Sequence, residues 1–201
     1  MEDQQTLPSL RLAVVPDALP LFTTVLQSGI EIKTTQGMSL AKFLSNFPGF
    51  TAEYLSDTVQ TIFLNGTAVD DLALPLNGNN PVVALSAAMP GLAGAIFRRN
   101  SFHSALRTET KSLLSKEIQQ QSISVCLKLF NSIAKERGAA LLKSGVCIRA
   151  DLLAGFLANR PHLLQQIETI QFEENQIDDD KLAGLLRELS KVNLYIVGAD
   201  D

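Results

Sequence analysis

The sequence predicts an α+β protein made of two small sheet-and-helix domains. Segments in which apolar and polar residues alternate, as in half-buried strands, are separated by segments with helical spacing. A short basic stretch lies between two acidic halves, and several short sequences of the first half recur in the second. A chain of 201 residues can bury a core of its own without disulfides or structural metals.

Charge is unevenly distributed and indicates where the domains meet. Residues 1–97 carry a net charge of −5, residues 98–117 of +3 and residues 118–201 of −2. A basic stretch between two acidic halves is typical of a connector. The expected parts are a first domain, a basic and partly helical connector, and a second domain, at residues 7–95, 96–120 and 121–201.

An internal repeat links the two halves. Residues 28–33 (SGIEIK) align with 144–149 (SGVCIR), and residues 41–48 (AKFLSNFP) align with 154–161 (AGFLANRP). The offset between matches falls along the chain, which needs only small deletions in surface loops and costs little entropy. Two further matches keep the same order, Thr61-Ile62 with Thr169-Ile170 and Asp70-Asp71 with Asp178-Asp179. The second domain is expected to be a diverged copy of the first, with chance similarity as the alternative.

Local signals define the elements of the first domain. Ser28-Gly29 either ends a helix or forms the tip of a hairpin. Ser39 is suited to cap a helix, because its hydroxyl can accept a hydrogen bond from an unpaired backbone N–H. Asn65-Gly66 tolerates the positive φ angles of a two-residue hairpin turn. The expected strands are residues 10–15, 30–34, 58–64, 67–69 and 82–85, and the expected helices are 17–27 and 40–46.

The almost uncharged segment at residues 81–97 needs a separate interpretation. Pro90, Gly91 and Gly94 interrupt it, whereas a membrane-spanning helix needs about 20 apolar residues without such breaks. We expect a buried strand that runs into an apolar loop.

The second domain shows the same kinds of pattern. In residues 123–130 the apolar residues Ile123, Val125, Leu127 and Leu129 alternate on one face, which is typical of a strand. Asp151 is expected to cap a helix, and His162 is expected in the first turn of a helix that begins at Pro161. The expected strands are residues 123–130, 146–149, 168–173 and 193–196, and the longer helices are 132–143, 152–158 and 178–190.

Residues 21–90 resemble the ubiquitin-like β-grasp fold of the sulfur-carrier proteins that serve thiamine and molybdopterin synthesis. The similar features are a hairpin FTTVLQ-SG-IEIKTT, a helix MSLAKFLSNF, a strand pair around Asn65-Gly66 and a closing strand PVVALS. The resemblance implies a small sheet that offers a face to protein partners. Those carriers end in a reactive Gly-Gly carboxylate, whereas here the chain continues past Gly94, so no acyl group is available for activation.

The segment at residues 88–100 (AMPGLAGAIFRRN) is the candidate ligand-binding site. Glycine lets backbone N–H groups approach an anion, and arginine adds positive charge. The spacing matches neither of the common glycine-rich phosphate-binding motifs. The alternative is an apolar connector packed between the domains, with its arginines solvated or paired to acidic residues. The candidate ligand-binding residues are Gly91, Gly94, Arg98 and Arg99.

Other chemistry is not expected. A basic strip runs from Arg98 to Lys116, but it lies in an acidic chain, so a solvated linker helix near residues 109–119 is favoured over nucleic-acid binding. The two histidines, His103 and His162, have no metal-binding or catalytic spacing. The acidic residues from 173 to 180 lack the glycine of a calcium loop and are expected to stabilise the start of the following helix. We expect no catalytic residue, no metal site and no cofactor.

These observations favour a non-enzymatic protein-interaction or assembly module whose partner is another protein. The alternative is a binder of small anionic molecules, or an accessory protein of sulfur transfer or molybdopterin synthesis, with its site at the Gly/Arg segment. An acidic N-terminal stretch without a secretion signal indicates a cytoplasmic protein, and neither membrane nor nucleic acid is expected as a partner. Oligomeric state and biological process stay open.

Overall fold

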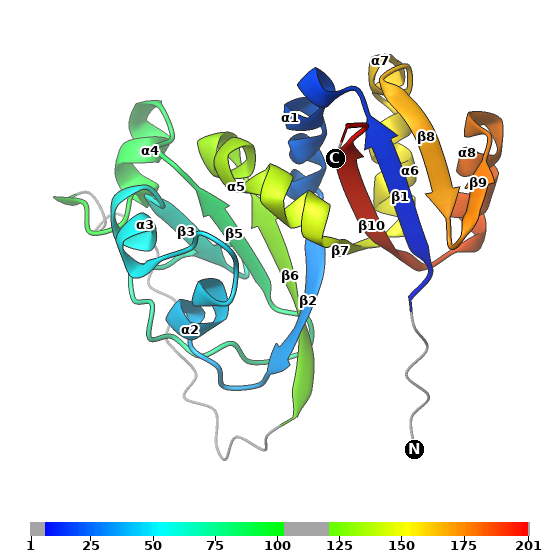
Figure 1. Cartoon of the computed structure of the whole chain (residues 1–201). Coiled ribbons are helices and arrows are strands. Elements are labelled where there is room, and N and C mark those ends of the chain that lie inside the picture. Colours follow the sequence, from blue (N-terminus) through cyan, green and yellow to red (C-terminus); the bar gives the residue numbers. More distant parts are fainter. Residues whose placement is uncertain (1–6, 103–120, 201) are drawn as a thin grey trace. The chain divides into compact units, whose positions relative to one another are not determined.

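The computed structural model describes residues 7–102 and 121–200 (Figure 1). The protein is mixed α+β, as predicted, and it divides into two compact units. The central unit is Ile32–Ile133, and the terminal unit combines Met1–Glu31 with Ala134–Asp201. The terminal unit is therefore assembled from two distant parts of the chain.

The structure has one open ten-stranded sheet, and the strands of the central unit follow the order β4-β3-β5-β6-β2 in it. Strands β3 (Thr61–Leu64) and β4 (Thr67–Ala68) form an antiparallel hairpin, and β3 also pairs antiparallel with β5 (Val82–Ser86). Strand β5 pairs in parallel with β6 (Ser122–Leu129). The remaining elements are β2 (Ile30–Thr35), α2 (Leu40–Ser45), α3 (Ala52–Asp57) and α4 (Gly91–Phe97).

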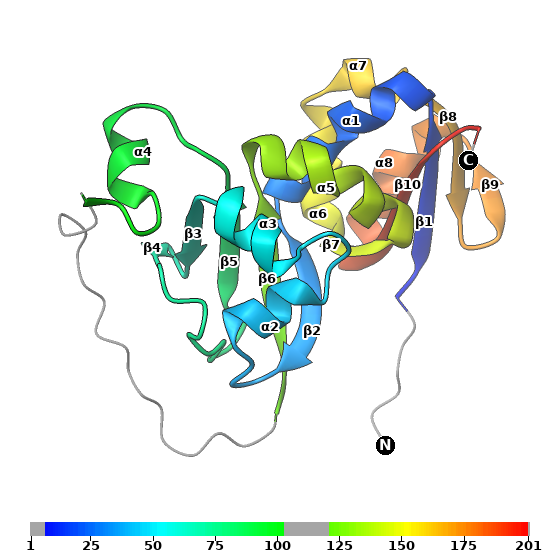
Figure 2. The ribbon, with the colours of Figure 1, turned by 60° about the vertical axis from the view of Figure 1, so that its left-hand side comes forward.

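One face of the central unit's sheet forms its core. Ile62, Val83, Leu85, Val125 and Leu127 on this face have no exposed surface. Figures 1 and 2 show α2 and α3 over the same part of this sheet. The apolar side chains of these two helices are buried as well, including Leu40, Phe43, Leu44 and Leu55.

Predicted local signals explain the ends of these elements. The Ser39 hydroxyl accepts a hydrogen bond from the Lys42 N–H at the start of α2, as predicted, and Thr51 caps α3 in the same way through the Tyr54 N–H. Asn65 and Gly66 have φ angles of 51° and 80°, which confirms the predicted two-residue turn between β3 and β4.

The strands of the terminal unit follow the order β7-β10-β1-β8-β9 and pair in both parallel and antiparallel directions. Strand β1 (Ser9–Val14) pairs in parallel with β10 (Lys191–Gly198) and antiparallel with β8 (Ile167–Phe172). Strand β10 pairs antiparallel with β7 (Val146–Arg149), and β8 pairs antiparallel with β9 (Asn175–Ile177).

The helices of the terminal unit bury the apolar side of this sheet. Leu10, Leu12 and Val14 of β1 have no exposed surface. Helices α6 and α8 pack against each other and bury Leu153 and Leu182. The helical elements are η1 (Pro16–Ala18), α1 (Leu19–Phe22), η2 (Thr23–Gln27), α5 (Asn131–Ser144), which begins in the central unit, α6 (Ala150–Ala158), α7 (Pro161–Leu164) and α8 (Asp179–Glu188).

The two units arrange their strands alike. In the strand order of each unit, the strand at one end of that order is followed by two parallel strands and then by a hairpin. Strands β2 and β7 hold this first position, and the next element after each is a helix, α2 or α6. The parallel pair differs in origin, because β5 and β6 follow the hairpin of the central unit, whereas β1 and β10 lie on either side of the β8–β9 hairpin in sequence.

The hairpin of the terminal unit was not predicted. Its turn is Glu173-Glu174, with Glu173 at a φ of 53°, and it leads into β9. The Glu173-Glu174 turn lies 108 residues after Asn65-Gly66, and Thr169 likewise lies 108 residues after Thr61. Two glutamates give no turn signal, so the sequence pattern missed this strand.

Three local predictions are wrong. The hairpin that the resemblance implied at residues 22–35 does not form, because Thr23–Gln27 is a 3-10 helix in which the hydroxyls of Thr23 and Thr24 donate to carbonyls three residues earlier. The helix expected from the residues at 17–27 is confirmed, as the short segments η1, α1 and η2. The apolar loop after β5 contains helix α4, which starts at Gly91. Asp151 does not cap α6, because the helix starts at Ala150 and the Asp151 carboxylate pairs with Arg149.

The expected domain bounds, residues 7–95 and 121–201, stay a prediction, as does the duplication. The connector expected at residues 96–120, with a helix near 109–119, lies mostly outside the described residues.

Gly138→Ala is expected to destabilise the protein, although alanine normally favours a helix. A Cβ atom at this position of α5 would lie 2.8 Å from Cβ of Thr23 and 2.9 Å from a methyl carbon of Leu26. We expect the free energy of unfolding to fall by about 1–3 kcal/mol. The change is measured by urea denaturation monitored with circular dichroism, because the chain has no tryptophan whose fluorescence would report unfolding.

The matched control is Gly184→Ala in α8, where a Cβ atom would meet nothing within 4 Å. It is expected to stabilise the protein by about 0.5–1 kcal/mol. Equal effects of the two substitutions would contradict a close contact between α5 and the Thr23–Gln27 segment.

Candidate functional site

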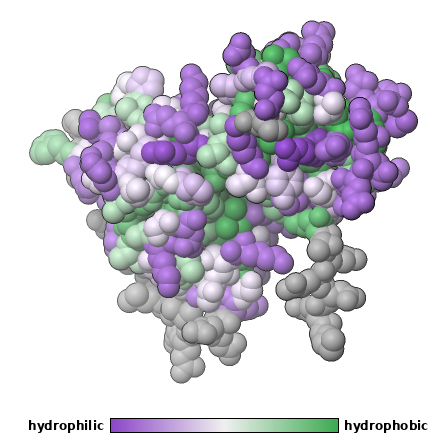
Figure 3. All heavy atoms as spheres, in the orientation of Figure 1, coloured by the Kyte–Doolittle hydropathy of each residue, from purple (hydrophilic) through white to green (hydrophobic). Residues whose placement is uncertain are grey.

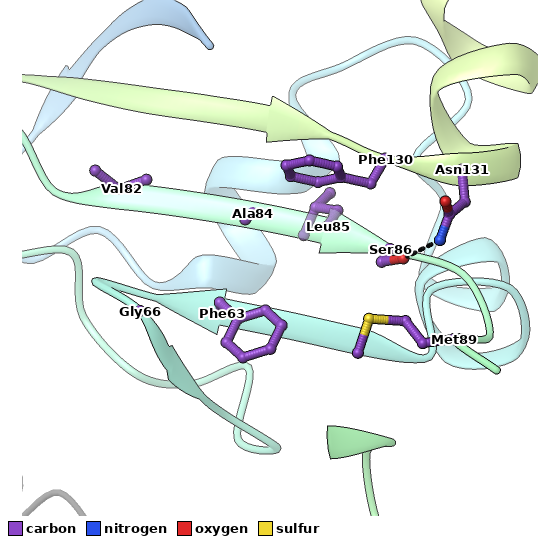
Figure 4. A pocket seen from close by; sticks show the side chains of 9 residues that line it. All are labelled: Phe63, Gly66, Val82, Ala84, Leu85, Ser86, Met89, Phe130 and Asn131. Carbon is purple, nitrogen blue, oxygen red and sulfur yellow. Dashed lines mark hydrogen bonds between the residues drawn. The ribbon is translucent and has the colours of Figure 1, made fainter. Parts of the chain in front are cut away.

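The central unit has a pocket of about 420 Å³ on the second face of its sheet, here named the sheet pocket. Figure 4 shows its lining residues, which come from β3 and the turn after it, from β5 and the segment after it, and from the two residues that follow β6. Most of the lining is apolar. The lining residues are Phe63, Gly66, Val82, Ala84, Leu85, Ser86, Met89, Phe130 and Asn131.

The register of the strands places these residues on one face. Phe63 lies opposite Ala84 across the β3–β5 pair, and Thr61 lies opposite Ser86. Residues directly opposite each other in an antiparallel pair point to the same side of the sheet. Because Val83 and Leu85 point to the buried core, the alternating residues Val82, Ala84 and Ser86 face the pocket.

Helix α4 is attached to the same face by an aromatic contact. The rings of Phe63 and Phe97 lie 5.3 Å apart between centroids, at an interplanar angle of 60°. Such edge-on aromatic pairs add to the stabilisation that burial itself provides. The contact keeps the end of α4 beside the pocket.

One end of the sheet pocket is polar. The Asn131 side-chain N–H donates a hydrogen bond of 2.8 Å to the Ser86 hydroxyl (Figure 4). Ser86 is 5% exposed. Because this hydroxyl accepts from Asn131, its own hydrogen can be donated to an acceptor in the pocket.

A second pocket of about 240 Å³ lies next to Met89, which lines both, and is here named the arginine pocket. Gly94 and Arg98 line it from α4 and the residue after it, and Thr61 lines it from β3. A Cβ atom at Gly94 would lie 1.7 Å from the Met89 carbonyl oxygen. Only glycine therefore lets α4 approach the backbone that forms this wall. The other lining residues are Gln60, Ala88 and Ala95.

The structure places the four expected ligand-binding residues differently. Gly94 and Arg98 line the arginine pocket, and Arg98 is exposed. Gly91 begins α4 with a φ of 73° and lines neither pocket. Arg99 points into the protein instead.

Arg99 holds three backbone segments together. Its guanidinium donates to the carbonyl of Leu55 at 2.7 Å, and more weakly to those of Val59 and Asp70. Its own backbone N–H donates to the Gln60 carbonyl at 2.7 Å. Burial lowers the pKa of the Arg99 guanidinium, and the charge of Asp70 partly opposes that shift. Arg99 therefore fixes the chain beneath the arginine pocket.

Sequence reasoning missed the residues of the sheet pocket. Phe63, Ala84 and Ser86 lie in predicted strands, but both faces of those strands are largely apolar, so the sequence pattern does not distinguish core from pocket. Met89 lies in the segment that composition had singled out.

Other chemistry-bearing residues lie apart from these pockets. His162 is exposed in α7 at the predicted first turn, and His103 lies outside the described residues. Asp178 pairs with Lys181 at the start of α8, and this hydrogen bond lowers the pKa of Asp178.

Within residues 7–102 and 121–200, no three His, Cys, Asp or Glu side chains come together as metal ligands. No helix in the same ranges has the length and apolar character needed to cross a bilayer.

Arg99→Met is expected to lower the free energy of unfolding by about 2 kcal/mol, because it leaves buried carbonyl oxygens without a donor. The neighbouring Arg98→Met, at an exposed position, is expected to change it by less than about 0.5 kcal/mol. Thermal and urea unfolding of the two variants measure the difference. A larger loss for Arg98→Met would contradict the assignment of Arg99 as the structural arginine.

Comparison of the chain with models of protein families, with curated proteins and with solved structures found no match. The two pockets therefore carry the functional inference.

Proposed function

We propose that the protein is a non-enzymatic binding protein whose central unit takes a small, largely apolar molecule in the sheet pocket. The observation that carries the proposal is a pocket of about 420 Å³ with an apolar lining and one polar end. Small-molecule sites generally have volumes of about 300–1,000 Å³, an apolar lining and a few polar groups that orient the ligand.

The lining indicates the chemistry of the ligand. Phe63, Val82, Ala84 and Phe130 offer apolar contacts along the strands. At the other end, the Ser86 hydroxyl can donate to a carbonyl or carboxylate oxygen of the ligand. This arrangement supports an apolar body with a single oxygen-bearing end.

The test is binding of the neutral apolar fluorescent probe N-phenyl-1-naphthylamine to the full chain. Ala84→Phe puts a ring into the sheet pocket and is expected to weaken probe binding at least about tenfold, a loss of about 1.4 kcal/mol of binding free energy. The matched control, Ala183→Phe, lies at an exposed position of α8 and is expected to leave binding unchanged. Unchanged probe affinity in a folded Ala84→Phe variant would overturn the proposal.

A protein partner is the second candidate. Leu92 on α4 is 72% exposed, which leaves its apolar side chain open to contact with a partner. Figure 3 shows a more hydrophobic surface over α4 than over α8 and β9, where hydrophilic side chains predominate. This supports the protein-interaction module expected from the sequence, with an apolar segment of a partner lying on α4.

One variant distinguishes the small-molecule candidate from the protein-partner candidate. Leu92→Ser is expected to abolish capture of a partner protein while leaving probe affinity within about twofold, since Leu92 does not line the sheet pocket. Affinity purification from cell extract and probe titration measure the two effects side by side. Loss of probe binding alone would contradict the role of Leu92 as a partner contact.

The architecture supports two further proposals. The recurrence of a strand, a helix and a hairpin around a parallel strand pair supports a β-grasp-like unit, one without the N-terminal hairpin that the resemblance implied. Its recurrence in both units, together with the aligned sequences, supports an internal duplication in which the origin of the parallel pair has changed. A sulfur-transfer or molybdopterin-related role rests on the resemblance alone.

A further inference from the structure

We propose that the arginine pocket binds the carboxylate of an amphipathic monocarboxylate whose apolar chain lies in the sheet pocket. This inference rests on the proposed function and adds the chemical class of the ligand. Three features of the central unit carry it: a buried hydroxyl without a partner, a cation beside it, and the junction of the two pockets.

The buried hydroxyl belongs to Thr61. This residue is 1% exposed, and its Oγ1 has no hydrogen-bond partner among the described residues. Leaving a buried hydroxyl unpaired is unfavourable, and such groups are rare in folded proteins. Because Thr61 lines the arginine pocket, a ligand oxygen there can accept its hydrogen.

The positive charge comes from Arg98. Arginine donates two parallel hydrogen bonds to a carboxylate, which makes it well suited to this head group. Gln60 adds a side-chain amide to the same wall, and no acidic side chain lines either pocket. The chain as a whole carries a net charge of −4, so attraction of an anion has to come from this local arrangement.

The two pockets meet where the head and body of such a ligand would join. Met89 lines both, and Thr61 of the arginine pocket lies directly opposite Ser86 of the sheet pocket across the β3–β5 pair. Side chains opposite each other in this way have Cβ atoms about 5 Å apart. The hydroxyls of Thr61 and Ser86 can therefore donate to the same carboxylate while the chain extends along Phe63 and Ala84.

The experiment compares octanoate with 1-octanol, which share an apolar chain and differ in the head group. Isothermal titration calorimetry of the full chain at pH 7.5 measures both, since octanoate is then ionised. We expect octanoate to bind at least about tenfold more tightly than 1-octanol. The advantage is expected to shrink as salt is raised from about 0.05 to 0.5 M, because screening weakens attraction to an exposed arginine.

Three variants assign the effect to residues. Arg98→Met and Thr61→Val are each expected to weaken octanoate binding about tenfold and to leave 1-octanol within about twofold. Thr61→Val removes a buried hydroxyl without a partner, so its thermal midpoint is expected to be unchanged or higher, which shows that the loss is not one of folding. The matched control Arg187→Met, at an exposed position of α8, is expected to bind both compounds like the unaltered chain.

The outcomes separate the two levels of the proposal. Equal affinity for octanoate and 1-octanol, insensitive to Arg98→Met and Thr61→Val, overturns the carboxylate site and leaves the sheet pocket as proposed. Failure of both compounds to bind, and of the neutral probe as well, overturns the proposed function and this inference together.

Discussion

The parallel pairing of β5 with β6 is the interaction on which the central unit depends. It joins Val82–Leu85 to Cys126–Leu129, residues that the chain brings together only through a long connection. Its register places Val83 and Leu85 beside Leu127 and Leu129, so one face becomes a continuous apolar core. The same register leaves the intervening residues on the opposite face, where the sheet pocket lies. The core and the sheet pocket therefore lie on opposite faces of the same pair of strands.

Local structure was predictable wherever a few neighbouring residues decide it. Asn65-Gly66 specifies its turn through backbone conformation alone, and Ser39 caps α2 through one short-range hydrogen bond. The Glu173-Glu174 turn has no such residue preference, so the β8–β9 hairpin depends on pairing across the sheet. At residues 17–27 the helix expected from the residues forms in place of the hairpin that the resemblance implied, and its 3-10 segment buries Val25 and Leu26.

The candidate site was predictable only in part, for a related reason. Unusual composition drew attention to residues 88–100, and this segment does supply Met89, Gly94 and Arg98 to the pockets. The sequence does not distinguish the roles of the adjacent Arg98 and Arg99. In the fold, Arg98 is exposed, whereas Arg99 donates hydrogen bonds to backbone carbonyls. Thr61 and Ser86 lie 25 positions apart, and only the β3–β5 register makes them neighbours.

The discontinuous terminal unit has a consequence for biosynthesis. Its strand β1 emerges from the ribosome early, but its parallel neighbour β10 is translated only after the whole of the central unit. Domains tend to fold as units during synthesis, in the order in which they become complete. The strands of Ile32–Ile133 can thus pair first. Until β10 has been synthesised, Leu10, Leu12 and Val14 of β1 stay exposed to solvent. During that interval we expect chaperones to bind the exposed apolar residues of the nascent N-terminal strand.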